Sequence, residues 1–302
     1  MNLQFLADGF IAGATIGLGA VGVTLTYSIL RFSNFAHGEY VSWGAYLALS
    51  LAGLLAGWLP SWADAIEPLS IGLNFILASL IALVLTGLMA WLIDRLLFAK
   101  LRQHGSTITL VMASFGASMA LRALLEVIYS TRPAYYSHEL QIAMDLGYGV
   151  RVTADQLLLL AVTAILVLAI YLLLVHTSMG RQMRAVSENP TLARIMGVDV
   201  DNVVRVTWWI GGALAAASGV LIGLVVQIRP GMGADLLLPL FAAAILGGIG
   251  SVPGALLGGL LVGLTEAVAV PVAGAQWRAG VSFAVLMAVL LLRPTGLFGA
   301  RR

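Results

Sequence analysis

The sequence predicts an all-α membrane protein, a single domain over residues 1–302 that crosses the bilayer eight or nine times. Of its 302 residues, 60% are hydrophobic and 10% are charged, whereas about 25% of the residues in an ordinary soluble domain are charged. Within lipid, long apolar runs satisfy their own backbone hydrogen bonds as helices. The 34 glycines fit this class, because small residues let membrane helices approach closely.

The spans follow from apolar stretches of about 20 residues, the length that crosses the hydrocarbon core. The first stretch lacks a basic flank and a cleavage site, so it predicts a span and not a removable signal peptide. A shorter stretch at 236–250 is the ninth candidate. The eight clear stretches lie near 9–30, 40–60, 70–93, 107–129, 155–175, 206–228, 254–273 and 277–293.

The distribution of Lys and Arg predicts the orientation, because cytoplasmic loops carry the excess of basic residues. With the polar segment 176–205 placed inside, alternation puts Arg31 and the basic residues of 95–102 on the same side. If 236–250 also crosses, the C-terminus ends inside. Eleven basic residues then lie inside, four lie outside and Arg122 lies within a span. This count favours nine spans over eight, with the C-terminus cytoplasmic.

Two breaks, at 31–39 and 247–254, interrupt the hydrophobic pattern and suggest broken helices. Glycine and proline interrupt helices and leave backbone N–H and C=O groups without their helical hydrogen bonds. At membrane depth such groups are tolerated only where protein or a water-filled cavity supplies hydrogen bonds to them. Transporters often carry such breaks beside the substrate path. The alternative is two ordinary tight connections. On the basis of these breaks and of one acidic residue within a span, we predict which residues line the substrate path. They are Asn34, His37, Gly38, Glu39, Gly247, Gly248, Gly250, Ser251 and Glu266.

Apart from charged residues at the span ends, three charged residues fall within predicted spans, where charge is costly and usually faces the bundle interior. Arg122 and Glu126 lie four residues apart and share a helix face. They either line a path or form a structural ion pair near an interface. Glu266 has no obvious local partner. The tryptophans at span ends are expected to anchor the membrane interfaces; they are Trp58, Trp62, Trp208, Trp209 and Trp277.

Several motifs of enzyme chemistry are missing from the sequence. The single lysine, Lys100, lies between Ala99 and Leu101, so the chain has no standard P-loop with which to hydrolyse ATP. It has no cysteine and no H-E-x-x-H, and its four histidines, which include His104, His138 and His176, lie in separate connections. We expect no catalytic residues, no metal site and no cofactor bound by this chain.

A short helix is predicted within the polar segment. Ser187 or Asn189 can cap a helix that begins at Pro190, where a missing N–H costs little. Gly197 is well placed to end it. Upstream, Arg181 and Arg184 belong to a basic run.

The predicted helix is amphipathic, because Leu192, Ile195 and Met196 share one face. Such a helix either lies on a lipid surface or inserts into a groove on a partner protein. The apolar face is short and the net charge of the segment is only about +1, which favours the partner.

Four runs carry a family resemblance over essentially the whole chain. They are YSILRFSNFAHGEYVSWGAYLAL, GRQMRAVSENPTLARIMGVDVDNVVRVTWWIGGALAAASGVLIGL, AAAILGGIGSVPGALLGGLLVGL and RPTGLFG. In this order they resemble the N-terminal signature, the coupling loop with its following span, the late Gly-rich region and the C-terminal ending of permease subunits of branched-chain amino-acid ABC transporters. The chain is most similar to the shorter of the two permease types.

The resemblance implies the partners and the location. It implies a heterodimer with a second permease, two cytoplasmic ATPase subunits that use ATP, and a periplasmic or surface-anchored substrate-binding protein, in a bacterial cytoplasmic (inner) membrane. No nucleic acid is expected. The residues implied in coupling to the ATPases are Arg181, Arg184, Glu188, Asn189, Pro190, Leu192, Ala193, Met196 and Gly197.

The implied function is import of branched-chain or related amino acids. The substrate stays open between leucine, isoleucine and valine, other amino acids, urea and short amides, because the binding protein sets much of the choice. Two other classes remain: an ion-coupled secondary carrier of small polar solutes, and a passive channel.

Overall fold

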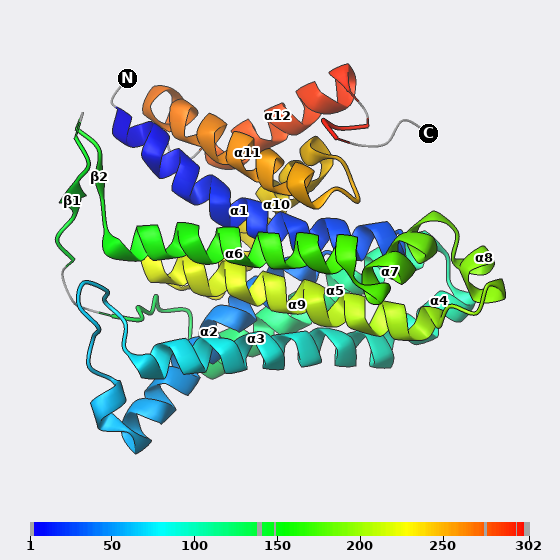
Figure 1. The fold of residues 1–302 in the computed structure, drawn as a ribbon, viewed down its shortest axis with the longest axis horizontal. Helices are drawn as coiled ribbons and strands as arrows, with labels where there is room; N and C mark the ends of the chain where they lie inside the picture. The colour runs from blue at the N-terminus through cyan, green and yellow to red at the C-terminus, as the bar shows by residue number, and fades with distance from the viewer. Residues whose placement is uncertain (1–2, 138–140, 148, 275–276, 294, 299–302) are drawn as a thin grey trace.

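The computed structural model describes residues 3–137, 141–147, 149–274, 277–293 and 295–298. Within them the chain is mostly helical (Figure 1). The elements, in chain order, are α1 (Leu3–Leu30), α2 (His37–Trp58), the 3₁₀ turn η1 (Pro60–Trp62), α3 (Leu73–Ile93), the π turn η2 (Asp94–Phe98), α4 (Ala99–His104), α5 (Thr107–Tyr129), β1 (Met144–Asp145), β2 (Arg151–Val152), α6 (Ala154–His176), α7 (Ser178–Glu188), α8 (Pro190–Ile195), α9 (Val200–Val225), α10 (Met232–Gly247), α11 (Val252–Ala273) and α12 (Arg278–Leu292).

Apolar helices long enough to cross a membrane make up the bundle. In the described part of the chain seven qualify by length and hydropathy, and two shorter apolar helices, Met232–Gly247 and Gly280–Leu292, accompany them. Each predicted span, including 236–250, corresponds to one of these nine helices. The chain is therefore a polytopic helical membrane protein. The 130–153 connection adds the antiparallel pair β1–β2, which the all-helical prediction did not include.

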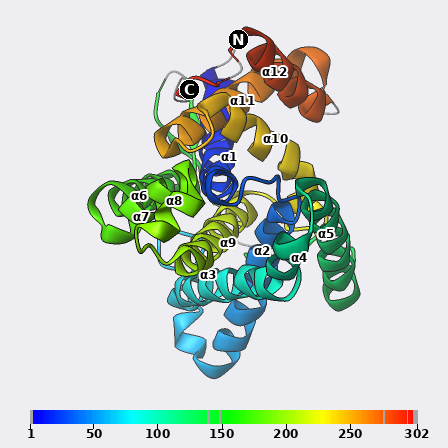
Figure 2. The same ribbon diagram turned by 90° about the vertical axis from the view of Figure 1, so that its right-hand side faces the viewer.

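The first helix, α1, is the centre of the bundle. Figure 2 shows α1 end-on, surrounded by α6, α9, α10 and α11. Its residues from Gly9 to Ile29 are almost all buried. A helix that is buried on all sides is apolar all round. The polar side chains that α1 carries in this stretch, such as Thr15 and Thr24, are hydrogen-bonded.

Small residues bring α1 and α11 into backbone contact. A Cβ atom added to Gly259 would lie 2.2 Å from the Cα of Gly17, and one on Gly263 would lie 2.4 Å from the Cα of Gly13. No side chain fits at these distances, so glycine is required on both helices. This glycine seam holds the first helix against a helix about 250 residues later in the chain.

Two helices, α2 and α10, begin part-way along the bundle. At the start of α2, His37 lies against Gly19 and Gly22 of α1. Gly19 is about 17 Å from the end of α1 at 1.5 Å per residue. The start of α10 meets the same place, because a Cβ on Gly233 would lie 1.9 Å from the carbonyl oxygen of Gly38. The segments 31–36 and 226–231 therefore run into the bundle before these helices start.

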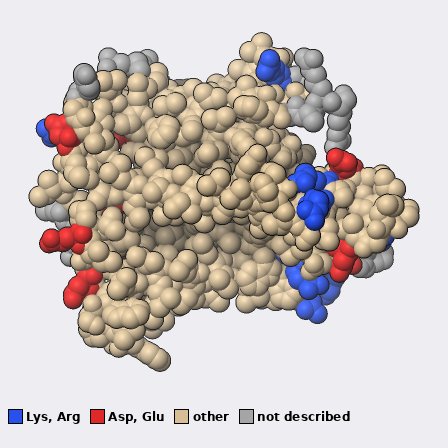
Figure 3. Space-filling view, viewed as in Figure 1, with Lys and Arg blue, Asp and Glu red and all other residues tan. Residues whose placement is uncertain are grey.

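The two ends of the bundle differ in charge. One end, which we call the α8 end, carries α7 and α8; the other, the hairpin end, carries β1 and β2 (Figure 1). On the face shown in Figure 3, basic side chains gather at the α8 end and acidic side chains prevail at the hairpin end. The described C-terminal residues also lie at the α8 end, because the N–H of Leu297 donates to the carbonyl of Leu246. Arg301 and Arg302 lie outside the described residues.

The expectation that Trp208 anchors an interface is wrong. Its side chain is fully buried and stacks on Phe98, with ring centroids 5.3 Å apart. Phe32 packs against both rings. The cluster joins segment 31–36 to α3, through its π turn, and to α9. By contrast, Trp58 is 86% exposed at the hairpin end of α2.

Candidate functional site

The polar segment folds as two short helices at the α8 end. The first, α7, begins at Thr177, whose hydroxyl accepts a 3.0 Å hydrogen bond from the N–H of Gly180. Met183 and Val186 are buried against Ile29 of α1. Helix α7 is therefore fixed to the bundle by its apolar face, which the prediction of a basic run did not foresee.

The cap of α8 is Asn189, one of the two candidates that the sequence offered. Its Oδ1 accepts hydrogen bonds of 3.0 Å from the N–H groups of Thr191 and Leu192. The other candidate, Ser187, donates instead to the carbonyl of Arg184 at 2.7 Å. Capping supplies the first N–H donors with an acceptor, so this short helix has a defined start.

The end of α8 is equally defined. Gly197 has φ +84°, which favours glycine. Its N–H donates to the carbonyl of Arg194 at 3.1 Å, and the N–H of Val198 donates to that of Ala193 at 3.0 Å. This pair of bonds is a Schellman motif. Because both ends are fixed, α8 presents its side chains in one orientation.

One face of α8 is apolar and uncovered in this chain. Leu192, Ile195 and Met196 are 56%, 75% and 76% exposed. Ala193, which the resemblance placed among the coupling residues, is only 5% exposed and packs against the bundle. It holds α8 against the bundle. Three apolar side chains left exposed together on one short capped helix indicate a docking surface.

The preceding helix, α7, carries three exposed charged residues of the segment. They are Arg181, Arg184 and Glu188. Arg31, at the end of α1, donates to the carbonyls of Ser187 and Glu188 at 2.9 and 2.7 Å. The link between α7 and α8 is thereby attached to the segment that leads into α2.

The first sequence break lies inside the bundle. Asn34, His37 and Glu39 are 4%, 1% and 1% exposed. The Nε2 atom of His37 lies 3.3 Å from the carbonyl oxygen of Gly19. Glu39 Oε1 accepts a 3.2 Å hydrogen bond from Ser118 of α5, whereas its Oε2 is buried and has no hydrogen-bond partner among the described residues. This break is not an ordinary tight connection.

The second break lies elsewhere. Residues 248–251 form the tight turn between α10 and α11 at the α8 end, as the alternative interpretation had it. Gly250 has φ +93° and donates its N–H to Thr24 at 2.8 Å. Gly250 and Ile249 border a cavity of about 310 Å³ together with Arg31. Of the predicted path residues, Gly247, Gly248, Gly250 and Ser251 therefore do not adjoin Asn34, His37, Gly38 and Glu39.

Glu266, the remaining predicted path residue, lies apart from both breaks. It is 5% exposed on α11 and accepts a hydrogen bond from Ser282 of α12. The sequence offered no local partner for it, and the structure supplies one from another helix.

Four charged residues that include Arg122 and Glu126 gather beside Glu39, and we call them the charged face. Arg122 Nε and Glu126 Oε1 are 3.1 Å apart on α5. The second pair, Arg229 and Asp235, lies at the start of α10, 2.8 Å apart. The sequence analysis missed the second pair. The signal was present, since both residues interrupt the apolar stretches on either side of them.

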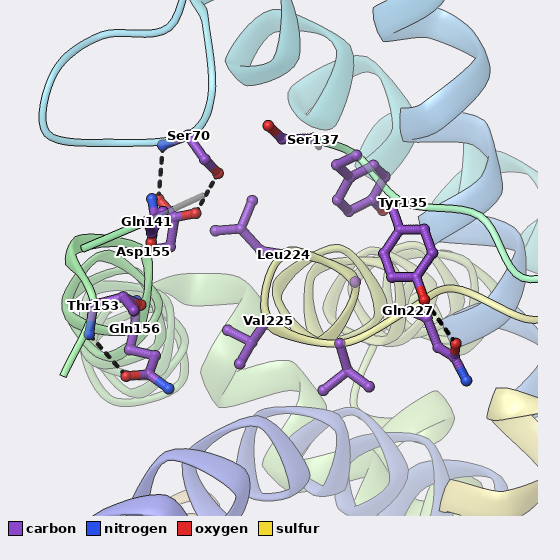
Figure 4. Close-up of a pocket in the computed structure, with 13 residues that line it drawn as sticks. Ser70, Tyr135, Ser137, Gln141, Thr153, Asp155, Gln156, Leu224, Val225 and Gln227 are labelled. Atoms are coloured by element: carbon purple, nitrogen blue, oxygen red, sulfur yellow. Dashed lines mark hydrogen bonds between the residues drawn. The ribbon is translucent and has the colours of Figure 1, made fainter. Parts of the chain in front are cut away.

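A polar cavity of about 280 Å³ opens at the hairpin end (Figure 4). Asp155 lines it, and its carboxylate accepts hydrogen bonds from the N–H and hydroxyl of Ser70. Across the cavity Tyr135 donates to Gln227 at 3.1 Å (Figure 4). These bonds tie three connections together, so the polar groups hold the hairpin end in shape.

The fold and the two sites define a membrane transport protein: a polytopic bundle with polar groups buried at its centre and a capped helix exposed at one end. Residues 5–290 match the family model described as the permease component of branched-chain amino acid transport systems. The chain belongs to this family.

The similar proteins agree with this assignment. The chain is 32% identical to the high-affinity branched-chain amino acid transport system permease protein LivH of Escherichia coli K12, over 98% of this chain and 95% of that one. It is 33% identical, with the same coverage, to the corresponding protein BraD of Pseudomonas aeruginosa. A solved structure, PsaBC from Streptococcus pneumoniae in complex with Fab, shares the fold with TM-score 0.50 and 16% identity, over 97% of this chain and 95% of that chain.

Proposed function

We propose that this chain is a permease subunit of an ABC importer that moves branched-chain or related amino acids into the cytoplasm, powered by separate ATPase subunits. The observation that carries the proposal is the exposed apolar face of α8. Leu192, Ile195 and Met196 are held in one orientation by caps at both ends, as a helix that inserts into a partner's groove requires. The chain itself binds no cofactor and catalyses no reaction; ATP is used by the partners.

The polar segment is the coupling site. The apolar face of α8 enters a groove on an ATPase subunit, and Arg181, Arg184 and Glu188 meet polar groups at its rim. Asn189, Pro190 and Gly197 fix the shape of the helix, and Ala193 holds it to the bundle. ATP-driven movement of the ATPases reaches the bundle through α7 and through Arg31.

The partners are a second permease, two ATPase subunits and a substrate-binding protein outside the membrane. The charge distribution in Figure 3 supports an orientation with the α8 end and the C-terminus in the cytoplasm, because basic residues favour that side. The hairpin end then faces the binding protein. The location is a bacterial cytoplasmic membrane.

The translocation path passes the first sequence break, which is buried in the bundle and contains Asn34, His37, Gly38 and Glu39. Buried polar groups within a bundle mark solute pathways in membrane proteins. Gly247, Gly248, Gly250 and Ser251 serve the path at its cytoplasmic exit, where Gly250 borders the cavity beside Arg31. Glu266 contributes through its contact with α12.

Reconstitution tests this proposal. We expect the chain to copurify with its ATPase subunits and a second permease, and the complex in liposomes to take up leucine only with ATP inside and binding protein outside. Ion-driven uptake by the purified chain alone would show a secondary carrier instead. Leucine flux without ATP or binding protein would show a passive channel.

A further inference from the structure

Two ion pairs from different helices meet on the charged face. Arg122 and Glu126 lie one helical turn apart on α5, whereas Arg229 and Asp235 flank the start of α10. The two pairs are close together, because a Cβ atom on Gly231 would lie 2.8 Å from Nη2 of Arg122. The guanidinium of Arg122 thus rests on the backbone just beyond Arg229, and the glycine leaves room for it.

The charged face lies part-way along the bundle, away from both of its ends, and it is partly exposed. The side chains of its four residues are between 38% and 61% exposed, yet they sit where α2 and α10 begin, part-way along α1. Behind them lies Glu39, within electrostatic range of Arg122, Glu126 and Asp235. Its buried Oε2 has no hydrogen-bond partner among the described residues. Buried polar atoms normally have a hydrogen-bond partner, so this oxygen can accept a hydrogen bond from a ligand.

We propose that the charged face, with Glu39 behind it, is the site that binds the amino and carboxyl groups of the transported amino acid. The inference rests on the proposed function and deepens it, since it names the residues that recognise the solute. The guanidinium groups of Arg122 and Arg229 receive the carboxylate, and Glu39 and Asp235 receive the ammonium.

Charge balance supports a zwitterion as the ligand. The four residues carry two positive and two negative charges, so the pairs are neutral together. An amino acid also has no net charge but carries one charge of each sign. It can insert between the partners of a pair, with its carboxylate on the arginine and its ammonium on the acid, and the net charge of the site does not change. An anion or a cation would add one unpaired charge at membrane depth.

The side chains of the two pairs are between 38% and 61% exposed in this chain, so a ligand can reach them from outside the bundle. A ligand that offers the same contacts can displace one partner. Arginine suits the carboxylate, because its planar fork of N–H groups matches two oxygens at once. Ser118, which bonds Glu39 Oε1, keeps that carboxylate oriented toward α5.

An aromatic group beside the charged face suits an aliphatic side chain. Phe115 precedes Arg122 by two turns of α5, and Phe241 lies on α10 beyond Asp235. Both contact Phe35, with ring centroids 6.3 and 5.9 Å apart. Seven residues of helix separate Phe115 from Arg122 by about 10 Å, so this apolar surface lies along the bundle from the charged face.

The test uses the complete transporter in liposomes with its leucine-loaded binding protein. Uptake and ATP hydrolysis are measured together for Arg122→Gln, Arg229→Gln and Asp235→Asn. Arg95→Gln is the matched control, because Arg95 is exposed and contacts only the ring of Trp91 in a cation–π interaction among the contacts described. We expect leucine carried per ATP to fall about tenfold in each variant, the effect of one lost charge-assisted contact, with binding-protein stimulation of the ATPase retained.

Three outcomes would contradict a proposal, and a fourth, in the further variant Arg122→Lys, would support it. An unchanged leucine-to-ATP ratio in all three variants, with normal uptake by the unmodified transporter, overturns this inference alone. Loss of the second permease from the purified variants overturns it too, because the pairs would then be subunit contacts. No ATP-dependent uptake by the unmodified transporter overturns the proposed function itself. Partial recovery in Arg122→Lys supports the inference, because the charge is restored.

Discussion

The guanidinium of Arg31 donates a 2.7 Å hydrogen bond to the backbone carbonyl of Glu188, and a second one, 2.9 Å long, to that of Ser187. Arg31 follows the last residue of α1 and has φ +56°, unusual for a residue with a side chain. A strained backbone that aims one side chain at the link between α7 and α8 indicates a functional position. The same residue opens the segment that leads inward to Glu39.

Replacing this arginine tests whether it transmits movement. We expect Arg31→Ala to reduce leucine uptake per ATP by roughly thirtyfold, because two hydrogen bonds of about 1 kcal/mol each are lost. ATPase binding should persist, since α8 keeps its own caps. The measurement is uptake and ATP hydrolysis in the same liposomes. Lys100→Ala, another exposed basic residue at the α8 end, is the control, and an equal effect there would exclude a specific role for Arg31.

Charge on the exposed face of α8 should prevent docking. We expect the double variant Leu192→Asp with Met196→Asp to lose copurification with the ATPase subunits and all ATP-dependent uptake, because a carboxylate in an apolar groove loses its hydration. The chain should still reach the membrane. Glu188→Arg should abolish uptake in the same way.

Thr191→Asp is the matched control for the double variant. Thr191 is exposed at the edge of the apolar face, one turn before Ile195, in the first turn of α8, where an acid is favourable. Normal copurification of the double variant would show that the exposed face of α8 is not needed to bind the ATPase subunits.

The glycine seam predicts opposite effects for the same substitution at two positions. Gly259→Ala places a methyl group 2.2 Å from Gly17, so we expect about 1–3 kcal/mol of destabilisation from overpacking. Gly53→Ala has nothing within 4 Å of the new atom and should stabilise its helix by about 0.5–1 kcal/mol. Thermal unfolding in detergent should show a lower midpoint for the first variant and an equal or higher one for the second. Equal shifts would contradict close contact between α1 and α11.

The natural lack of cysteine allows a test of water access. Ser118 faces Glu39, whereas Leu124 lies on the opposite side of α5 and is 51% exposed in this chain. We expect Ser118→Cys to react with a charged thiol reagent in the assembled transporter and Leu124→Cys to react far more slowly. Labelling of this subunit on a gel is the measurement. Equal slow labelling at both positions would show that no water reaches Glu39.

Local features were predictable from the sequence, and long-range partnerships were not. The cap at Asn189 and the stop at Gly197 depend on residues within a few positions, so the limits of α8 followed from the sequence. The apolar stretches likewise predicted the helices, because length and hydropathy act within each segment. Trp208 was misplaced because its partner, Phe98, is over 100 residues away.

The candidate path was predictable only in part, for the same reason. The segment from Asn34 to Glu39 stood out through its polarity in an apolar chain. Its relation to Arg229 and Asp235 depends on α10 starting beside α2, which no local pattern states. The donor to Glu266, Ser282, lies on the next helix and depends on how α11 and α12 pack.

The glycine seam has a consequence for how the protein is made. The helix at the centre of the bundle leaves the ribosome before the other described helices, yet it packs against Gly259 and Gly263 of α11. Until those residues are synthesised, α1 has no α11 to pack against, and lipid or helper proteins cover its small-residue face. Contacts between distant parts of a chain form slowly. The order in which the helices enter the membrane is therefore not the order in which they pack, and the centre of this bundle is among the last parts to be completed.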